Sequence, residues 1–314
     1  MMAHMDPNLP MPVWAGVRTM FRLPWTSELA GAQIAFVGIP YDVATTGRPG
    51  ARFGPTAIRS VSSMIAELAH YPTGFSIQSD VAAVDTGDLE IDIHNPMTVP
   101  AMITARIAAT LQAGAFPIVM GGDHFVTFPV LRAIAAEHGP VALVHFDAHT
   151  DTWEPTSGDD LNHGTMFVHA IREGLIDVDR SIQIGIRTHN PDTRGIKILD
   201  ARWVREHGTA AVAAAVLERV GDAKSYLTFD IDCLDPAFAP GTGTPVAGGL
   251  ASRDAIDIVA AIGHANFVGM DLVEVAPIYD SAEATALAGA TLIHEFVAAH
   301  FGRAHRIGGT RRAT

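Results

Sequence analysis

VALVHFDAHTDT, residues 141–152, is the stretch of this sequence that decides its fold. Apolar and β-branched residues come first, and Asp147, His149 and Asp151 then follow at every second position. In an extended strand, residues two and four apart point to the same face, so these three polar side chains would lie together. Burying them without a partner would cost roughly several kcal/mol. The stretch predicts a metal site at the C-terminal end of a buried strand; the alternative is a polar strand end with Asp147 as a cap or turn residue.

The spacing of the two acids limits how they could bind metal. Asp147 and Asp151 would lie about 13 Å apart in a fully extended chain, at ~3.3 Å per residue. A single ion at a ligand distance of ~2 Å could not hold both. Either the chain curls after Asp147, or the ligands serve more than one ion, or both.

Composition excludes several classes of protein. The 314 residues carry a net charge of −13 and include only two lysines, so the chain is not built to coat nucleic acid or an anionic membrane. Its single cysteine, Cys233, excludes an internal disulfide and fits a reducing compartment. The N-terminus lacks the apolar region of a signal peptide, and no apolar run approaches the ~20 residues of a membrane span. We therefore expect a cytoplasmic protein with no nucleic-acid or membrane partner.

Short apolar strands alternate with helices along the chain. Besides the opening stretch, strands are predicted at 33–39, 81–84, 116–120, 181–186, 225–231 and 267–275. Helices are predicted at 55–69, 97–113, 125–138, 166–173, 210–220, 252–262 (capped by Ser252) and 284–300. This alternation predicts an α/β three-layer αβα sandwich with a central, mostly parallel sheet. We expect a single domain over residues 1–314, with the Pro-rich residues 1–32 forming an irregular arm over the surface or over a neighbouring subunit.

Polar side chains follow four of these strands. The set consists of Asp123 and His124, the triplet of the opening stretch, Asp230 and Asp232, and Glu274. Because parallel sheets bind ligands beyond the carboxyl ends of their strands, we expect these groups to converge at one edge.

The converging groups predict a pair of metal ions. Asp230 and Asp232 share one face, about 6.6 Å apart along an extended strand. That spacing suits two ions separated by ~3.5–4 Å. The candidate ligands are four carboxylates and two imidazoles: His124, Asp147, His149, Asp151, Asp230 and Asp232. Oxygen-rich sites favour Mn²⁺ or Mg²⁺, whereas Zn²⁺ usually takes four N and S ligands. We therefore expect a hydrolase that uses two Mn²⁺ to activate a water near neutral pH.

Five long motifs, in order along the chain, match a known family. They are GGDHF (121–125), VHFDAHTDT (144–152), NHGTMF (162–167), FDIDCLDPAFAPGTGTPVAGGL (229–250) and GMDLVEVAPIYD (269–280). With these motifs the chain resembles the ureohydrolases, which include arginases, agmatinases and guanidinobutyrases, from about Gln33 onward. Within that family it looks most similar to the bacterial agmatinases. The resemblance implies an arginase/deacetylase-like fold, cleavage of a guanidino group to urea and an amine, and trimers or hexamers.

The resemblance also implies roles for individual residues. One Mn²⁺ would be bound by His124, Asp147, Asp151 and Asp230. The other would be bound by His149, Asp147, Asp230 and Asp232. His163 resembles the histidine that relays protons to the departing amine, and Glu274 resembles the carboxylate that grips the guanidinium. No member of this set is missing, which argues against the remaining alternative, a catalytically silent metal-binding homologue.

The loop 152–162 bears on the choice of substrate. It carries Glu154, Asp159 and Asp160 and no basic residue. Such a loop suits a substrate with a bare ammonium at its far end, such as agmatine, and should repel the carboxylate of arginine or 4-guanidinobutyrate. The other interpretation is that these acids form a solvated surface. Arg48 or Arg187 could instead turn inward and meet a carboxylate.

Three further residues have no expected part in catalysis. His145 is expected to face the opposite side of its strand from Asp147. Asp271, inside a strand, is expected to accept structural hydrogen bonds, and Cys233 to be a buried small side chain.

Overall fold

The structure, a computed structural model, describes residues 12–157 and 160–302. Eight strands form one sheet in the order β2-β1-β3-β8-β7-β4-β5-β6, and every neighbouring pair is parallel. The strands are β1 (Ile34–Gly38), β2 (Ala83–Asp88), β3 (Phe116–Met120), β4 (Ala142–Phe146), β5 (Ile182–Ile184), β6 (Lys197–Leu199), β7 (Ser225–Asp230) and β8 (Phe267–Val273). The helices are α1 (Gly54–Ser62), α2 (Val99–Gln112), α3 (Thr127–His138), α4 (Met166–Arg172), α5 (Ala201–Val220), α6 (Ser252–Ile262) and α7 (Ala284–Phe301).

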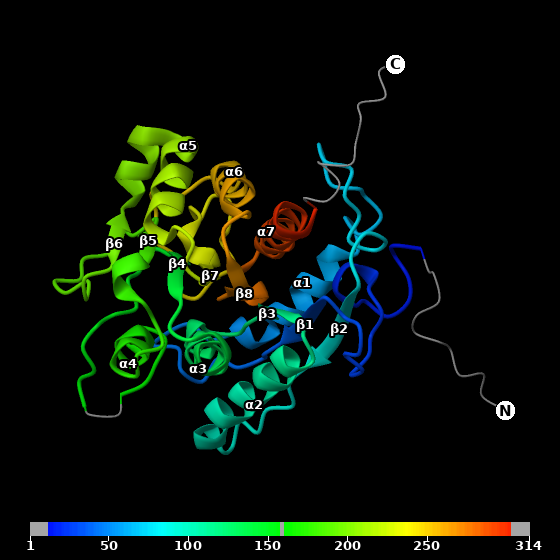
Figure 1. Cartoon of the computed structure of the whole chain (residues 1–314), viewed down its shortest axis with the longest axis horizontal. Coiled ribbons are helices and arrows are strands. Elements are labelled where there is room, and N and C mark those ends of the chain that lie inside the picture. Colours follow the sequence, from blue (N-terminus) through cyan, green and yellow to red (C-terminus); the bar gives the residue numbers. More distant parts are fainter. Residues whose placement is uncertain (1–11, 158–159, 303–314) are drawn as a thin grey trace.

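Helices cover both faces of the sheet. Figure 1 shows α1, α7, α6 and α5 on one side and α2, α3 and α4 on the other, and the contacts between neighbouring helices follow the same division. Consecutive strand residues serve the two sides in turn: Phe36 of β1 packs in the apolar cluster under α1 and α7, and Val37 packs in the cluster under α2 and α3. The predicted three-layer sandwich is confirmed.

The sheet order brings the polar strand ends together. β3, β8, β7 and β4 are consecutive neighbours at the centre of the sheet. All four run in the same direction, so the residues that follow them meet at one edge. These are the four strands after which the sequence places its acids and imidazoles, and they position the site.

Two helices differ from the sequence prediction. α1 ends at Ser62, not near residue 69, because the hydroxyls of Ser62 and Ser63 donate to the carbonyls of Arg59 and Ser60, a local bond that competes with helix continuation. α5 begins at Ala201, capped by Asp200, and runs through a kink at Gly208 (φ 80°), so the predicted 210–220 is only its second part.

Three smaller predictions also change. β6 was missed because three residues at the sheet edge are too short to show a pattern. Ser252 is the first residue of α6, whose N-cap position belongs to Ala251. In the N-terminal arm, Met20 and Phe21 are fully buried, so this part belongs to the core, while residues 1–11 lie outside the described residues.

None of the helices in the described part of the chain is both long enough and apolar enough to span a membrane.

Candidate metal centre and active site

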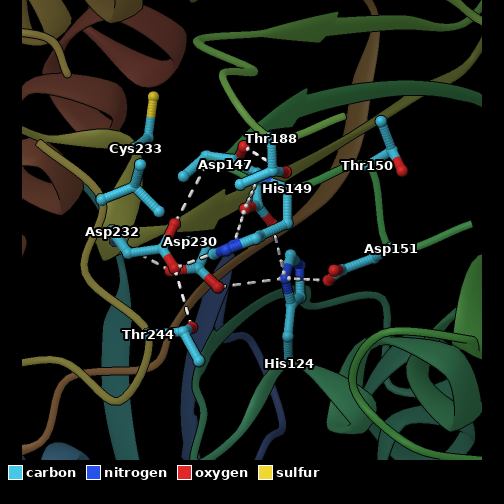
Figure 2. A network of polar contacts seen from close by, with 12 residues as sticks. His124, Asp147, His149, Thr150, Asp151, Thr188, Asp230, Asp232, Cys233 and Thr244 are labelled. Atoms are coloured by element: carbon cyan, nitrogen blue, oxygen red, sulfur yellow. Dashed lines mark hydrogen bonds and ion pairs between the residues drawn. The ribbon is translucent and has the colours of Figure 1, made fainter. Parts of the chain in front are cut away.

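The first half of the centre surrounds His124. Its Nδ1 lies 3.1 Å from Asp147 Oδ2, 3.0 Å from Asp151 Oδ2 and 3.3 Å from Asp230 Oδ2. His124 begins the 3-10 turn after β3, while the three acids come from the ends of β4 and β7. Figure 2 shows these side chains pointing toward one another. Three strand ends therefore deliver one imidazole nitrogen and three carboxylates to a single point.

The second half lies beside it, around His149. The Nδ1 of His149 is 3.2 Å from Asp147 Oδ1 and 3.1 Å from Asp232 Oδ2. Backbone N–H groups hold the acids in place: His149 N donates to Asp147 Oδ1 and Ala148 N donates to Asp232 Oδ1. Asp147 thus presents one oxygen to each half, which is the arrangement of a carboxylate shared between two sites.

Asp151 reaches the first half because the chain curls. The strand ends at Phe146, and Asp151 has a φ of 51°, in the left-handed region that non-glycine residues rarely adopt. The curl predicted from the spacing of Asp147 and Asp151 is therefore present.

His145 does not face away from Asp147, so that prediction is wrong. Its Nε2 lies 2.7 Å from Asp147 Oδ2, and both side chains are fully buried. Residues two apart on a strand share a face, and this parity was already present in the sequence. Because its Nδ1 lies 3.0 Å from Gln183 Nε2, an amide donor, His145 Nε2 carries the proton and donates it to Asp147.

The cluster is short of positive charge. Burial and the charges of Asp232 and Asp147 raise the pKa of Asp230 well above its usual value. Burial and the charge of Asp147 also raise the pKa of Asp232. No lysine or arginine within residues 12–157 and 160–302 forms an ion pair with these acids. Bound cations would supply the missing charge.

The residues fit a metal. His124 Nδ1 is buried and has no hydrogen-bond partner, although three carboxylate oxygens lie within 3.3 Å of it. A nitrogen placed among carboxylates without hydrogen-bond geometry is suited to sharing a central cation with them. Two groups of side chains have ligand atoms within 4.8 Å of one another: His124, His145, Asp147 and Asp151, and Asp147, His149 and Asp232. Cys233 points away in Figure 2 and its Sγ contacts the carbonyl of Ile184 at 3.5 Å, which leaves an oxygen- and nitrogen-donor set.

Glu274 and His163 stand next to the cluster. His163 Nδ1 lies 3.0 Å from Glu274 Oε1, which also accepts from the backbone N–H of His124 at 2.9 Å. Glu274 is 1% exposed and has a φ of 63°, a strained conformation that is typical of functional sites. None of the hydrogen bonds among the described residues reaches Glu274 Oε2. That oxygen is therefore available to a ligand.

The cavity over this site measures ≈ 420 Å³, within the range of roughly 300–1,000 Å³ that is usual for small-molecule sites. His149, Asp151, Asp230 and His163 lie at its inner end.

Two of the three predicted substrate-binding acids line the more exposed part of that cavity. Glu154 and Asp160 both line it, whereas Asp159 lies outside the described residues. Asp160 accepts from Thr156 and Asn162, whose hydrogen bonds lower its pKa. Glu154 pairs with Arg194 and Arg172, which lower its pKa too.

The two arginines considered as carboxylate partners are otherwise engaged. Arg187 donates to five backbone carbonyls, those of Gly185, Asp232, Cys233, Leu234 and Val246. Arg48 lies over the ring of Tyr279, with 3.9 Å from its Cζ to the ring centroid.

The sequence analysis missed several side chains of the site. Thr46 contacts His163 Nε2 through its backbone N–H at 3.1 Å and its hydroxyl at 2.9 Å. Trp153 and Asn162 line the cavity. Only proximity to the metal motifs could have suggested Trp153 and Asn162, and nothing in the order of residues links Thr46 to His163, 117 positions away.

Comparison with known proteins agrees with this geometry. The family model of the arginase family matches residues 32–299. The chain belongs to the arginase family. This ureohydrolase is 51% identical over 278 residues to a protein of Chromobacterium violaceum named agmatinase, covering 88% of this chain and 86% of that protein. The ureohydrolase assignment and the predicted fold are both confirmed, and the family depends on metal ions that the buried cluster is able to hold.

Two solved structures have the same fold. A hypothetical agmatinase from Burkholderia thailandensis is 48% identical with a TM-score of 0.91, covering 93% of each chain. Proclavaminate amidino hydrolase from Streptomyces clavuligerus is 38% identical with a TM-score of 0.88, covering 94% of this ureohydrolase and 100% of that chain. Relatives of similar fold therefore carry names that refer to different substrates.

Proposed function

We propose that this ureohydrolase cleaves agmatine to putrescine and urea with two Mn²⁺ per chain. The observation that carries the proposal is Glu274, a buried carboxylate that pairs with His163 through Oε1, while no hydrogen bond among the described residues reaches its Oε2. The relative from Chromobacterium violaceum, named agmatinase, supports the choice of substrate.

The chain's own ligands would hold the two ions. His124, Asp147, Asp151 and Asp230 would bind one ion, and His149, Asp147, Asp230 and Asp232 the other. The two oxygens of Asp147 face different histidines, His124 and His149, which supports its role as a bridge. The carboxylate of Asp230 is paired only with His124, in the first half of the centre. When bound, such a pair of ions supplies a water that is acidic near neutral pH.

Glu274 would orient the guanidinium. A guanidinium presents donors in a fixed plane, and a carboxylate oxygen accepts them in short, charge-assisted bonds. Oε1 is already occupied by His163 and His124 N, so Oε2 would take the substrate. This holds the guanidinium carbon beside the metal cluster in one orientation.

His163 would supply the proton that hydrolysis requires. Water adds to the guanidinium carbon, the C–N bond to the amine breaks, and the departing amine takes up a proton. Burial opposes a charge on His163, but its hydrogen bond and charge interaction with Glu274 outweigh burial and raise its pKa to about 9. A histidine held beside a carboxylate in this way would carry the proton that the departing amine takes up.

The outer end of the cavity would select the substrate. Asp160, and in our proposal Glu154 and Asp159 with it, would attract the far ammonium of agmatine. No lysine or arginine lines the described part of the cavity, and Arg187 has committed its donors to the backbone. A carboxylate-bearing substrate would therefore meet no direct partner there.

One observation favours a second candidate. Glu154 is paired with Arg172 and Arg194, so its negative charge at the rim is already balanced. If a substrate displaced Glu154, these arginines could receive a carboxylate, as in 4-guanidinobutyrate or arginine. The third possibility, a catalytically silent homologue, would require a lost ligand or active-site residue, and the full set is present.

Steady-state kinetics on agmatine, arginine and 4-guanidinobutyrate separate these functions, with bound Mn²⁺ measured in parallel. We expect kcat/KM to be highest for agmatine. A higher kcat/KM for either carboxylate-bearing compound would overturn the agmatine proposal. No urea from any of the three, with two Mn²⁺ bound, would favour the silent homologue.

We also propose that the chain is one domain that forms trimers or hexamers in the cytoplasm. Three large apolar side chains near the N-terminus, Trp14, Val17 and Trp25, are 77%, 52% and 54% exposed, which supports an interface between copies. Light scattering on the purified protein tests this, and a monomeric mass would contradict it.

A further inference from the structure

Asp271 is a fully buried carboxylate beneath the metal centre. It lies on β8, and no lysine or arginine of the described residues pairs with it. Its oxygens accept from hydroxyls alone. Thr127 donates to Oδ2 at 2.8 Å, Tyr226 donates to Oδ2 at 2.9 Å, and Thr228 donates to Oδ1 at 2.6 Å. A buried carboxylate satisfied only by hydroxyls, without a cation, calls for an explanation.

The Thr228 hydroxyl connects Asp271 to His124. Besides Asp271 Oδ1, it lies 2.8 Å from His124 Nε2. A hydroxyl has one proton to give, and an ionised carboxylate can only accept. Thr228 must therefore donate to Asp271 and accept from His124, which places the ring proton on Nε2.

This direction determines what His124 can do. With the proton on Nε2, Nδ1 keeps its lone pair, and Nδ1 is the atom that lies 3.0 to 3.3 Å from Asp147, Asp151 and Asp230. A neutral imidazole with a free nitrogen facing the centre is the form that binds a metal. The reversed chain of hydrogen bonds would put a proton where the ion has to sit.

We propose that Asp271 is a positioning residue of the metal centre, acting through Thr228 to keep His124 in the tautomer whose Nδ1 binds the cation. Asp271 also adds a negative charge behind that ligand, which strengthens its hold on a divalent ion. This inference rests on the proposed metal centre and is independent of which guanidino compound is the substrate.

His149 provides a comparison within the same protein. Its Nδ1 faces Asp147 and Asp232, but none of the hydrogen bonds among the described residues reaches its Nε2. Loss of the Asp271–Thr228 chain should therefore weaken the His124 half of the centre and leave the His149 half largely intact.

The experiment is a Mn²⁺ titration of the chelator-stripped full chain, with free Mn²⁺ followed by electron paramagnetic resonance. In Thr228→Val, the dissociation constant of one of the two ions should rise about 10- to 100-fold, the usual effect of losing a partner behind a ligand. In Asp271→Asn, which keeps an oxygen acceptor but loses the charge, the rise should be about tenfold.

Two matched variants separate this role from packing. Thr228→Ser restores the hydroxyl and should bind Mn²⁺ within about threefold of the wild type. Tyr226→Phe removes another hydroxyl from Asp271 without interrupting the path to His124, and it should also stay within about threefold, well below the usual effect of a lost partner.

Wild-type affinity for both ions in Thr228→Val or Asp271→Asn overturns the proposal. Equal losses in Thr228→Ser and Thr228→Val would overturn it as well, because packing alone would then explain both. If the buried variants fail to fold, NMR of the wild type loaded with Cd²⁺ decides: a His124 Nε2 proton shifted downfield by a hydrogen bond to Thr228 supports the proposal, and an Nε2 proton at the shift of an unbonded imidazole contradicts it. Since no step involves agmatine, a failure of the substrate assignment leaves these results unchanged.

Discussion

Two buried histidines of this protein each leave one ring nitrogen without a hydrogen-bond partner. They are His124, through Nδ1, and His294, through Nε2. His124 stands at the carboxyl edge of the sheet, whereas His294 lies in α7, beside the rings of Phe21 and His70. The two histidines are alike in being buried and in leaving one ring nitrogen without a hydrogen bond, but the residues around them differ.

Charge makes the difference. Burial opposes a charge on His124, but in the metal-free protein the three carboxylates that face its Nδ1 outweigh burial and raise its pKa well above the usual value. Burial and the charge of His70 instead lower the pKa of His294 to about 4. The neighbouring carboxylate of Glu295 pairs with His70 and not with His294. An unpartnered nitrogen therefore indicates a metal site only where negative charge converges on it, and His294 is an uncharged member of the core.

The largest effect that tests this contrast is loss of a ligand. His124→Ala should empty one Mn²⁺ position and lower kcat by more than about 100-fold, beyond the usual cost of losing a group that only supports a ligand. His294→Gln is the matched control and should keep both ions. Mass spectrometry measures the Mn²⁺ content of both variants, and urea release measures their kcat. Unchanged Mn²⁺ stoichiometry in His124→Ala would refute its role as a ligand.

Much of this site could be predicted from the sequence because it depends on short-range rules. Spacing on a strand places Asp147, His149 and Asp151 together, and the carboxyl ends of parallel strands bring Asp230 and Asp232 to the same edge.

What could not be predicted depends on side-chain partners remote in sequence. The pairing of Glu154 with Arg172 and Arg194, and the contact of Thr46 with His163, are set by how loops pack. The wrong prediction for His145 has another cause. Residues 145 and 147 are two apart on a strand, so the sequence alone already places their side chains on the same face.

The two glutamates that pair with histidines in the described part of the chain should differ next. Glu274→Gln removes the charge that would orient the guanidinium, and a charge-assisted hydrogen bond contributes about 1.5–3 kcal/mol. We therefore expect kcat/KM to fall about 10- to 100-fold. Glu295→Gln, whose wild-type carboxylate bonds to His70 at 2.9 Å, should keep wild-type kinetics. Equal kcat/KM in Glu274→Gln and the wild type would remove Glu274 from the active site.

His163 in the active site and His294 in the core should also change the free energy of unfolding with pH in opposite directions in the metal-free protein. His163 has its pKa raised to about 9, so its stabilising contribution is complete below the ordinary value of about 6.5 and is lost as pH rises through 9. His294 has its pKa lowered to about 4, so folding is penalised increasingly as pH falls from about 6.5 to 4. Each change amounts to about 3 kcal/mol at most.

Chemical unfolding of the metal-free protein between pH 4 and about 9.5 measures both slopes. Glu274→Gln should flatten the alkaline slope alone, and His294→Gln the acid slope alone. The same slopes in variant and wild type would show that other groups control the pH dependence.

The smallest effect concerns acids at the rim of the cavity. Asp160→Asn should raise KM for agmatine about two- to fivefold, the range of an exposed charge interaction, with kcat unchanged. Asp254, which pairs with Arg253 on α6, is outside this cavity, so Asp254→Asn should leave KM unchanged. An unaltered KM in Asp160→Asn would assign that acid to the solvated loop surface.

The central claim is that the buried acids and imidazoles hold two ions that hydrolysis requires. Its most direct test is a titration of the chelator-stripped protein with Mn²⁺ while urea release from agmatine is recorded. We predict no urea without metal and a maximal rate when two Mn²⁺ are bound per chain. Urea release that persists after complete metal removal, or a maximum at one ion per chain, would contradict it.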